Sequence, residues 1–379
     1  MATPPALTVP HPVRLIFTGG FLGAGKTTSL AALARLLLAR GQKVGIVTND
    51  QSPNLADTVI VREMLGKLGV PVEEVVEGCF CCHFDQLVAQ MDKVLASGAR
   101  VLLGEPVGSC TDFVAAVANP IRLHYGDSFH FAPLSALVDP ARVRELLLGE
   151  NQTLLPAEVS YLFRKQLEEA DLIVLNKVDT LVPDEEARLL AALQAAYPAK
   201  RVLAVSAREG RGVEEWLDLL LSEGSWARSV IAEIDYDTYA EAEAGLGWLN
   251  AAVMLSADQP WSPAELLKTL GRGLQKAFRD QGAEIGHLKF VLTAGDQAQW
   301  GNLTALSGEP WVNSPALPPL TEAKLVVNAR VSLLPAVLEA VVRQELAALA
   351  PVRAEVRDLA CFQPAYPNPP YLLRETPAQ

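Results

Sequence analysis

The fold of this chain is decided by one short segment, Gly20-Phe21-Leu22-Gly23-Ala24-Gly25-Lys26-Thr27. The segment has the form GxxxxGK[ST]. It follows an apolar run at residues 13–17 that predicts a buried strand, and it precedes an Ala/Leu-rich run at residues 28–40 that predicts a helix. A strand, a glycine-rich turn and a helix in this order form a phosphate-binding loop, and a glycine-rich turn that binds nothing is the weaker interpretation.

Each residue type in this loop suits a phosphate. The glycines let backbone N–H groups approach the phosphates without Cβ clashes, and the start of the helix adds a partial positive charge. We expect Lys26 to reach the β- and γ-phosphates and the Thr27 hydroxyl to bind Mg²⁺. The predicted phosphate contacts are Gly20, Gly23, Ala24, Gly25, Lys26, Thr27 and Thr28.

Short apolar runs continue to alternate with amphipathic runs as far as residue 221. This alternation predicts right-handed βαβ units and a parallel sheet covered by helices on both faces, the α/β fold of P-loop NTPases. The predicted strands are residues 43–48, 75–77, 100–104, 134–138, 172–176 and 201–205. The predicted helices are residues 56–68, 85–96, 183–196 and 213–221.

The pattern changes after residue 222. Predicted strands at residues 248–255, 287–293, 324–331 and 353–362 and helices at 263–280 and 334–348 have the order βαββαβ, with a possible hairpin at 300–311. This order is typical of a ferredoxin-like α+β domain. We therefore predict a disordered lead (1–12), a P-loop domain (13–222), an interdomain connection (223–246), a smaller C-terminal domain (247–363) and a Pro-rich tail (364–379).

Two further segments point to guanine as the base. Asp179, in Asn176-Lys177-Val178-Asp179, can accept two hydrogen bonds from guanine, whereas adenine lacks this pair of donors. Ser206-Ala207 either support the base or form an ordinary strand-to-helix turn. The predicted contacts with GTP on this side are Asn176, Lys177, Asp179, Ser206 and Ala207.

Candidate switch residues follow the second and fourth predicted strands. Glu105-Pro106-Val107-Gly108 is an ExxG segment that either places a carboxylate near Mg²⁺ and the Gly108 N–H near the γ-phosphate, or forms a Gly/Pro turn. Because Ser109 stands where a water-positioning glutamine is common, we expect slow hydrolysis. Asp50 either holds Mg²⁺ through water or caps the next segment. The predicted catalytic residues are Lys26, Thr27, Glu105 and Asp50, with Thr27 and Glu105 at Mg²⁺.

Three of the five cysteines form the cluster Cys79-Phe80-Cys81-Cys82. Thiolates are favoured ligands for Zn²⁺ and Co²⁺, and three ligands leave a position open for metal transfer. Buried core thiols or a redox pair are the alternatives. His83 is either a further ligand or an ordinary histidine, and Cys110 either approaches the cluster or is a small buried residue.

The composition limits the compartment and the partners. With 32 Lys plus Arg against 44 Asp plus Glu, the net charge is −12, which disfavours nucleic acid and anionic membranes as partners. An odd number of clustered cysteines does not suit a disulfide framework, and residues 1–12 do not have the pattern of a signal peptide. We therefore expect a cytoplasmic protein.

Together these motifs resemble those of the CobW-like metallochaperone GTPases, relatives of UreG and HypB. The resemblance rests on GGFLGAGKTT from Gly19, GCFCC from Gly78, ExxG from Glu105 and NKVD from Asn176. It implies GTP hydrolysis with Mg²⁺, loading of Zn²⁺ or Co²⁺ on Cys79, Cys81 and Cys82, and delivery to a client metalloprotein. We also expect a nucleotide-dependent homodimer.

Other hypotheses stay open at this point. The chain lacks the NEFG-type segment after its second strand and the His-rich run of many family members. A G-protein regulator or assembly chaperone of a corrinoid enzyme or other metalloenzyme, with structural cysteines, is therefore the second hypothesis. An ATP-using kinase or ligase is the third, and Asp179 argues against it.

Overall fold

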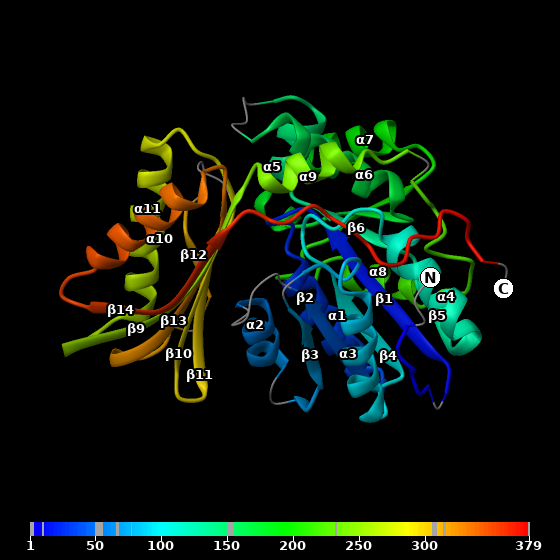
Figure 1. Ribbon diagram of the computed structural model, residues 1–379, viewed down its shortest axis with the longest axis horizontal. Coiled ribbons are helices and arrows are strands. Elements are labelled where there is room, and N and C mark those ends of the chain that lie inside the picture. Colours follow the sequence, from blue (N-terminus) through cyan, green and yellow to red (C-terminus); the bar gives the residue numbers. More distant parts are fainter. Residues whose placement is uncertain are drawn as a thin grey trace.

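A computed structural model describes residues 4–9, 11–49, 56–65, 68–76, 78–150, 155–231, 233–304, 309–313 and 316–377. The strands of these residues form two sheets, which lie in two lobes side by side (Figure 1). The sheet of the N-terminal lobe is parallel, and the sheet of the C-terminal lobe is antiparallel. Both parts of the predicted fold class are confirmed.

The parallel sheet places the phosphate loop, residues 20–27, at its centre. Its strand order is β3-β2-β4-β1-β6-β7-β8, and β5 also pairs with β1. The carboxyl ends of parallel strands meet at one edge of a sheet, so the segments that follow β1, β4, β6 and β7 lie close together there. The strands are β1 Val13–Gly20, β2 Val44–Asn49, β3 Val72–Val75, β4 Val101–Glu105, β5 Phe129–Phe131, β6 Ser135–Val138, β7 Leu172–Leu175 and β8 Arg201–Ala204.

Helices cover both faces of this sheet because its strands are apolar on both sides. In β1, Leu15 and Phe17 are buried in one core cluster, and Ile16 between them is buried in the other. The first cluster contains α3, α6 and α7, and the second contains α1, α2 and α8. These helices are α1 Lys26–Ala39, α2 Ala56–Leu65, α3 Phe84–Ala96, α6 Ala157–Glu169, α7 Pro183–Ala196 and α8 Val213–Leu220.

Some elements differ from the prediction. The third strand is β3 Val72–Val75 rather than residues 75–77, because Val72 and Val75 point into the core while two glutamates between them conceal the strand pattern. The predicted connection at 223–246 contains a helix, α9 Tyr236–Ala244, which packs on α6 through Tyr239 and Leu162. Further short elements are β5, α4 Asn119–Tyr125, α5 Pro140–Arg142, and the turns of helix at Val114–Ala118, Gly126–Ser128, Val143–Leu147 and Val178–Thr180.

The C-terminal lobe has the expected ferredoxin-like order, extended by a hairpin. Its strand order is β12-β11-β10-β13-β9-β14, and α10 and α11 pack on one face through the second large core cluster. The opposite face is turned toward the N-terminal lobe (Figure 1). The elements are β9 Gly247–Trp261, α10 Pro263–Asp280, β10 Ile285–Ala294, β11 Gln297–Leu303, β12 Trp311–Val312, β13 Leu320–Val331, α11 Pro335–Ala347 and β14 Arg353–Phe362.

The two lobes contact each other next to the phosphate loop. Ile60 of α2 packs against Val291 of β10 and Val326 of β13. The Arg142 guanidinium donates to the backbone oxygens of Ile285, at 2.7 Å, and Thr304, at 2.9 Å. Strands β10 and β11 are therefore held against the edge of the parallel sheet at which the nucleotide is expected.

The first and last described segments both lie on the N-terminal lobe. The segment after β14 crosses from the C-terminal lobe over the front of the N-terminal lobe (Figure 1). Its Tyr371 is buried against Phe84, with 4.9 Å between ring centroids, and Arg374 donates to Asp112 at 2.6 Å. In the lead, the Tyr125 hydroxyl donates to the Pro5 oxygen at 2.8 Å.

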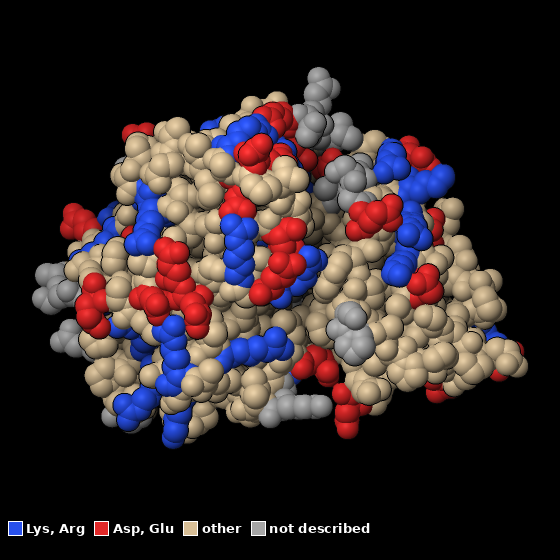
Figure 2. All heavy atoms as spheres, turned by 180° about the vertical axis from the view of Figure 1, so that it is seen from behind, with Lys and Arg blue, Asp and Glu red and all other residues tan. Residues whose placement is uncertain are grey.

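Basic and acidic side chains are interleaved over both lobes on the face that Figure 2 shows. Among the ion pairs of the protein, Arg40–Asp218, at 2.6 Å, is an exposed pair. Such exposed pairs typically stabilise a fold by only about 0–1 kcal/mol each. Among the described residues, every helix is too short or too polar to span a bilayer.

A substitution at Gly20 tests how β1 joins the phosphate loop. Gly20 has φ +125°, and a Cβ there would collide with the backbone of Leu137, whose N atom would be 2.8 Å away. We expect Gly20→Ala to lower the free energy of unfolding by more than about 3 kcal/mol, because strain and a backbone clash add. Gly41→Ala is the control, since φ is +74° but no atom lies within 4 Å. It should cost about 1 kcal/mol. If urea unfolding gave equal losses of unfolding free energy for the two variants, the clash with Leu137 would not be the cause.

Candidate nucleotide and metal site

The phosphate loop joins β1 to α1 with the geometry expected from its glycines. Gly25 precedes α1 in the left-handed conformation, with φ 88°. A Cβ at this position would lie 2.5 Å from Nδ2 of Asn176, so only glycine fits. The Lys26 ammonium donates to the Gly20 oxygen at 2.9 Å and lies inside the loop. The loop therefore presents its backbone and its lysine to one small space.

Thr27, in the first turn of α1, meets Glu105 because α1 follows β1, which is the neighbour of β4. β4 pairs with β1, and Glu105 is its last residue. The Thr27 hydroxyl donates to Oε1 of Glu105 at 3.0 Å, and both side chains are buried. A hydroxyl and a carboxylate oxygen are the kinds of ligand that Mg²⁺ prefers. The two residues predicted to hold Mg²⁺ are thus in contact at the phosphate loop.

Asn176, at the end of β7, connects the phosphate loop to the segment after β8. Its Nδ2 donates to the Ala24 oxygen at 2.8 Å, and its Oδ1 accepts from the Ala207 N–H at 3.1 Å. Lys177 has φ 59° and donates to Oδ2 of Asp139 at 2.6 Å. The predicted phosphate and base segments are therefore held together by side-chain hydrogen bonds.

Asp179, the predicted guanine acceptor, lies beside Ser206. The Ser206 hydroxyl donates to Oδ1 of Asp179 at 2.6 Å, and the Arg208 guanidinium donates to Oδ2. The Asp179 side chain is only 4 % exposed, whereas that of Arg208 is 51 % exposed. The carboxylate is thus oriented by Ser206, and a base that donates to Asp179 must compete with an exposed arginine.

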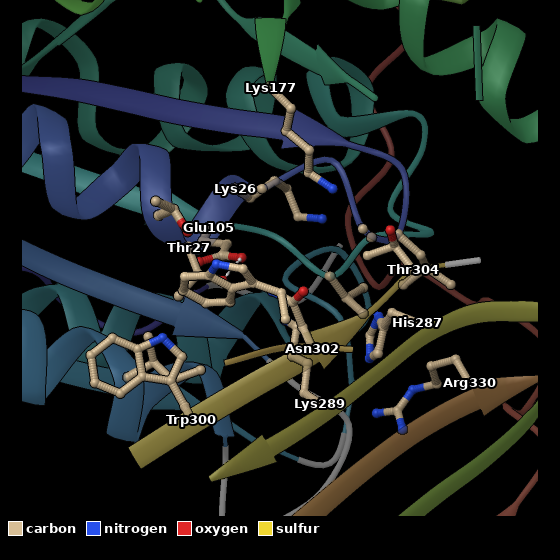
Figure 3. Close-up of a pocket in the computed structure, with 18 of the residues that line it drawn as sticks. Lys26, Thr27, Glu105, Lys177, His287, Lys289, Trp300, Asn302, Thr304 and Arg330 are labelled. Atoms are coloured by element: carbon tan, nitrogen blue, oxygen red, sulfur yellow. Dashed lines mark hydrogen bonds between the residues drawn. The ribbon is translucent and has the colours of Figure 1, made fainter. Parts of the chain in front are cut away.

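The pocket at the phosphate loop is closed on one side by the C-terminal sheet (Figure 3). His287 and Lys289 alternate on β10, and Trp300 and Asn302 alternate on β11, so that each pair faces the loop. Burial, with the nearby charges of Lys289, Arg330 and Lys26, lowers the pKa of His287 well below its usual value. The pocket residues from the C-terminal lobe are His287, Lys289, Trp300, Gly301, Asn302, Thr304, Trp311 and Arg330.

The thiol cluster, Cys79, Cys81 and Cys82, lies in the loop between β3 and α3. The three sulfur atoms are all within 4.8 Å of one another, with 2.6 Å between Cys79 and Cys81 and 3.9 Å between Cys81 and Cys82. Hydrogen bonds from the Cys79 and Cys81 thiols lower the pKa of Cys82 to about 3. These hydrogen bonds favour the thiolate form of Cys82, which is the form that binds metal.

Asn49, the last residue of β2, joins this cluster to the switch segment, residues 105–110. Its Oδ1 accepts from the Phe80 N–H at 3.0 Å and from the Val107 N–H at 3.4 Å. Its Nδ2 donates to the Gly78 oxygen at 2.6 Å. One buried amide therefore contacts both the thiol loop and the segment between Glu105 and Gly108.

The other predicted residues are placed as follows. Gly23, Gly25, Lys26, Thr27, Thr28, Glu105, Gly108 and Lys177 line the same pocket. Asp50 lies outside the described residues. The His83 ring packs on Gly78, and among the described residues the thiol group contains cysteines alone. Cys110 is buried, and its thiol is within hydrogen-bonding reach of Cys81.

Sequence reasoning placed Asn49 in the candidate first switch with Asp50 but gave it no contact, and it missed Arg142 and the pocket residues of β10 and β11. A weak signal existed for the strands, because polar His287 and Lys289 alternate with apolar Leu288 and Phe290. Such alternation predicts a strand with two different faces, but it does not say what the polar face contacts. Asn49 carried no signal beyond its position at a strand end.

Comparison with known proteins gives one matching family model and several similar proteins. A family model described as the CobW/HypB/UreG nucleotide-binding domain matches residues 14–204. Two curated proteins called zinc chaperone CobW are similar: one from Pseudomonas aeruginosa is 29% identical over 209 residues, and one from Sinorhizobium sp. is 27% identical over 254 residues. The crystal structure of the Zn(II)-bound YjiA GTPase from E. coli aligns with 16% identity and a TM-score of 0.34.

The extent of these similarities differs. The match covers 48% of this chain and 52% of the P. aeruginosa protein, and 60% of this chain and 67% of the Sinorhizobium protein. The chain thus spans about half the length of the first of these curated relatives. The YjiA alignment covers 89% of this chain and 99% of that chain.

Proposed function

Since this chain belongs to the CobW/HypB/UreG family of nucleotide-binding proteins, we propose that it hydrolyses GTP and uses the cycle to handle a divalent metal ion. The metal is loaded on Cys79, Cys81 and Cys82 and passed to a client metalloprotein. Zn²⁺ is the first candidate, because the curated relatives are called zinc chaperones and thiolates suit this ion.

The observation that carries the proposal is the position of Asn49. Its amide contacts Phe80 of the thiol loop and Val107 of the switch segment at once. Gly108, the residue after Val107, lines the nucleotide pocket. A movement of Gly108 toward a γ-phosphate would pull the Val107 N–H, and the shared acceptor transmits this movement to the thiol loop. The nucleotide site and the thiol cluster therefore share one hydrogen-bonded connection.

The chain's own residues have distinct parts in hydrolysis. Lys26 and the backbone of the phosphate loop would neutralise charge on the phosphates. Thr27 and Glu105 would hold Mg²⁺, which supplies positive charge to the β- and γ-phosphates when it is bound. Asp179 and Ser206 would select and orient the base.

We propose that intrinsic hydrolysis is slow. Ser109, at the place of a water-positioning glutamine, is buried, and its hydroxyl donates to Glu243 of α9. Its side chain therefore points to the helix rather than to the phosphates, and it is poorly placed to orient an attacking water.

The C-terminal lobe would couple the nucleotide state to the binding of a client protein. Strands β10 and β11 close the nucleotide pocket, and α2 packs on the same sheet face. A change in the pocket would therefore alter the contacts across the lobe interface and so connect hydrolysis to metal release.

Metal affinity tests the proposal. Zn²⁺ affinity is measured by competition with a chelator under reducing conditions, with Mg²⁺ plus a slowly hydrolysed GTP analogue and with Mg²⁺ plus GDP. We expect at least about tenfold tighter binding with the analogue, which corresponds to a coupling free energy of about 1.4 kcal/mol. Cys81→Ser should remove most of the affinity in both states. Equal affinities in the two states, or an unchanged Cys81→Ser variant, would contradict the proposal.

A further inference from the structure

We propose that Cys110 is a fourth thiolate ligand of the metal site, supplied by the switch segment, so that the nucleotide state sets whether three or four thiolates hold the ion. This inference rests on the proposed function and extends it by one residue outside the CxCC segment. The four sulfur ligands would then come from two loops that are 28 residues apart in the sequence, with Cys82 in one and Cys110 in the other.

The backbone places Cys110 against the thiol cluster. Cys110 ends a tight turn in which its N–H donates to the Val107 oxygen at 2.9 Å. Gln166 of α6 donates to the oxygens of Gly108, at 2.9 Å, and Cys110, at 3.1 Å. Cys110 is 6 % exposed, and its thiol lies within hydrogen-bonding reach of Cys81. The turn is therefore braced from behind, and its cysteine faces the cluster.

The two loops are also held side by side through the backbone. Oδ1 of Asn49 receives the N–H groups of Phe80, at 3.0 Å, and Val107, at 3.4 Å. Phe80 lies between two cysteines of the cluster, and Val107 begins the turn that ends at Cys110. The turn that carries Cys110 is therefore held beside the thiol loop by the amide of Asn49.

Competing ligands near Cys110 are already engaged. The two carboxylate oxygens of Glu169 accept from the N–H groups of Phe113, at 2.9 Å, and Val114, at 2.6 Å. The Tyr239 hydroxyl receives the Thr111 N–H at 3.3 Å. A soft metal ion at this place would thus meet sulfur rather than oxygen, as Zn²⁺ and Co²⁺ in thiolate sites prefer.

Four-coordinate metal would require the sulfur atoms to move. Four sulfur atoms at about 2.3 Å from a tetrahedral ion lie about 3.8 Å from one another. The Cys81–Cys82 separation of 3.9 Å already matches this value, whereas Cys79 and Cys81, at 2.6 Å, must move apart. Cys110 lies outside the group of three sulfur atoms that are within 4.8 Å of one another, so its turn must bring it closer to the cluster. Each thiol that binds loses its proton to solvent, so binding by protonated thiols releases protons.

The coupling to nucleotide follows from the chain itself. Gly108 lines the nucleotide pocket, and Cys110 is two residues away. With GTP bound, Gly108 is drawn to the γ-phosphate and the turn closes on the cluster, which gives four thiolates. After hydrolysis the turn relaxes, and three thiolates with one open position hold the ion for transfer.

Cobalt spectroscopy of the full-length protein tests the inference. Co²⁺ is added under reducing conditions, and the intensity of the thiolate-to-cobalt charge-transfer absorption is recorded with Mg²⁺ plus a GTP analogue and with Mg²⁺ plus GDP. We expect the intensity of wild-type protein to be about one quarter lower with GDP, because one of four thiolates is lost. Cys110→Ser should show the lower intensity in both states, and its Zn²⁺ affinity with the analogue should fall at least about tenfold.

Cys361→Ser is the matched control. Cys361 lies on β14 in the other lobe, and its thiol donates to the Pro335 oxygen at 3.1 Å. The Cys361→Ser substitution should leave the cobalt spectra in both nucleotide states unchanged. Identical wild-type spectra in the two states, or a Cys110→Ser spectrum equal to that of wild type with the analogue, would overturn the inference. The comparison of wild-type spectra with the GTP analogue and with GDP needs no variant, so it tests the inference even if Cys110→Ser does not fold. If wild-type protein binds no Co²⁺ or Zn²⁺ at all, the proposed function fails instead.

Discussion

Asp179→Ala is expected to abolish the preference for guanine nucleotides. A site built around a hydrogen-bonded pair rejects an analogue that lacks the pair by about 10⁴, so removal of the carboxylate should bring GTP and ATP affinities to within about tenfold of each other. The carboxylate is 4 % exposed and oriented by Ser206 at 2.6 Å, so little freedom is lost when the base binds. Titration with fluorescent GTP and ATP analogues measures the ratio.

The control for this prediction is Asp184→Ala. Asp184 is an exposed acidic residue in the first turn of α7, close to Asp179 in the sequence. It should leave the ratio of GTP to ATP affinity unchanged. A wild-type protein without a preference for GTP, or an Asp179→Ala variant that retains it, would show that another group reads the base.

Lys26→Ala is expected to reduce kcat for GTP hydrolysis by about 10²–10³, because it removes one preorganised charge at the site of charge development. The ammonium lies inside the phosphate loop, 2.9 Å from the Gly20 oxygen, and is buried. It is thus shielded from water. In such a buried place its charge acts more strongly on a phosphate than it would in bulk water. Phosphate release under saturating GTP and Mg²⁺ measures the effect.

Lys43→Ala provides the comparison for this second prediction. Lys43 is an exposed lysine just before β2, at the other end of α1 from the loop. Its loss should leave kcat unchanged within about twofold, as expected for a surface residue. A Lys26→Ala variant with kcat near that of wild type would show that Lys26 does not contribute to hydrolysis.

Elements with a strong local pattern were predicted with little error. α7, α10 and β14 have the predicted bounds, because regular apolar periods, and Pro183 and Pro263 in the first turns of the helices, act within a few residues. Elements with weak local patterns were predicted wrongly or not at all. β3 is an edge strand with two glutamates at its centre, and α9 is rich in acidic residues. Burial of α9 depends on α6, which lies about 70 residues earlier in the chain.

The sequence by itself determined the phosphate loop, the close spacing of the three cysteines and the alternation of strands with helices. These features depend on residues that are neighbours in the chain, where backbone hydrogen bonding and a regular apolar period act directly. Glu105 was also a candidate from its place after an apolar strand. Its contact with Thr27 required β4 to lie beside β1, an order that the sequence pattern does not specify.

Only the tertiary structure decided what surrounds these motifs. It placed the Asn49 amide between the thiol loop and the switch segment, and it brought Cys110 to Cys81. It also turned the polar face of β10 and β11 toward the phosphate loop and laid the tail over α3 through Tyr371. Such contacts join residues tens to hundreds of positions apart, and they depend on how whole sheets and helices pack. No local periodicity of apolar residues predicts these contacts, so they are known only from the folded structure.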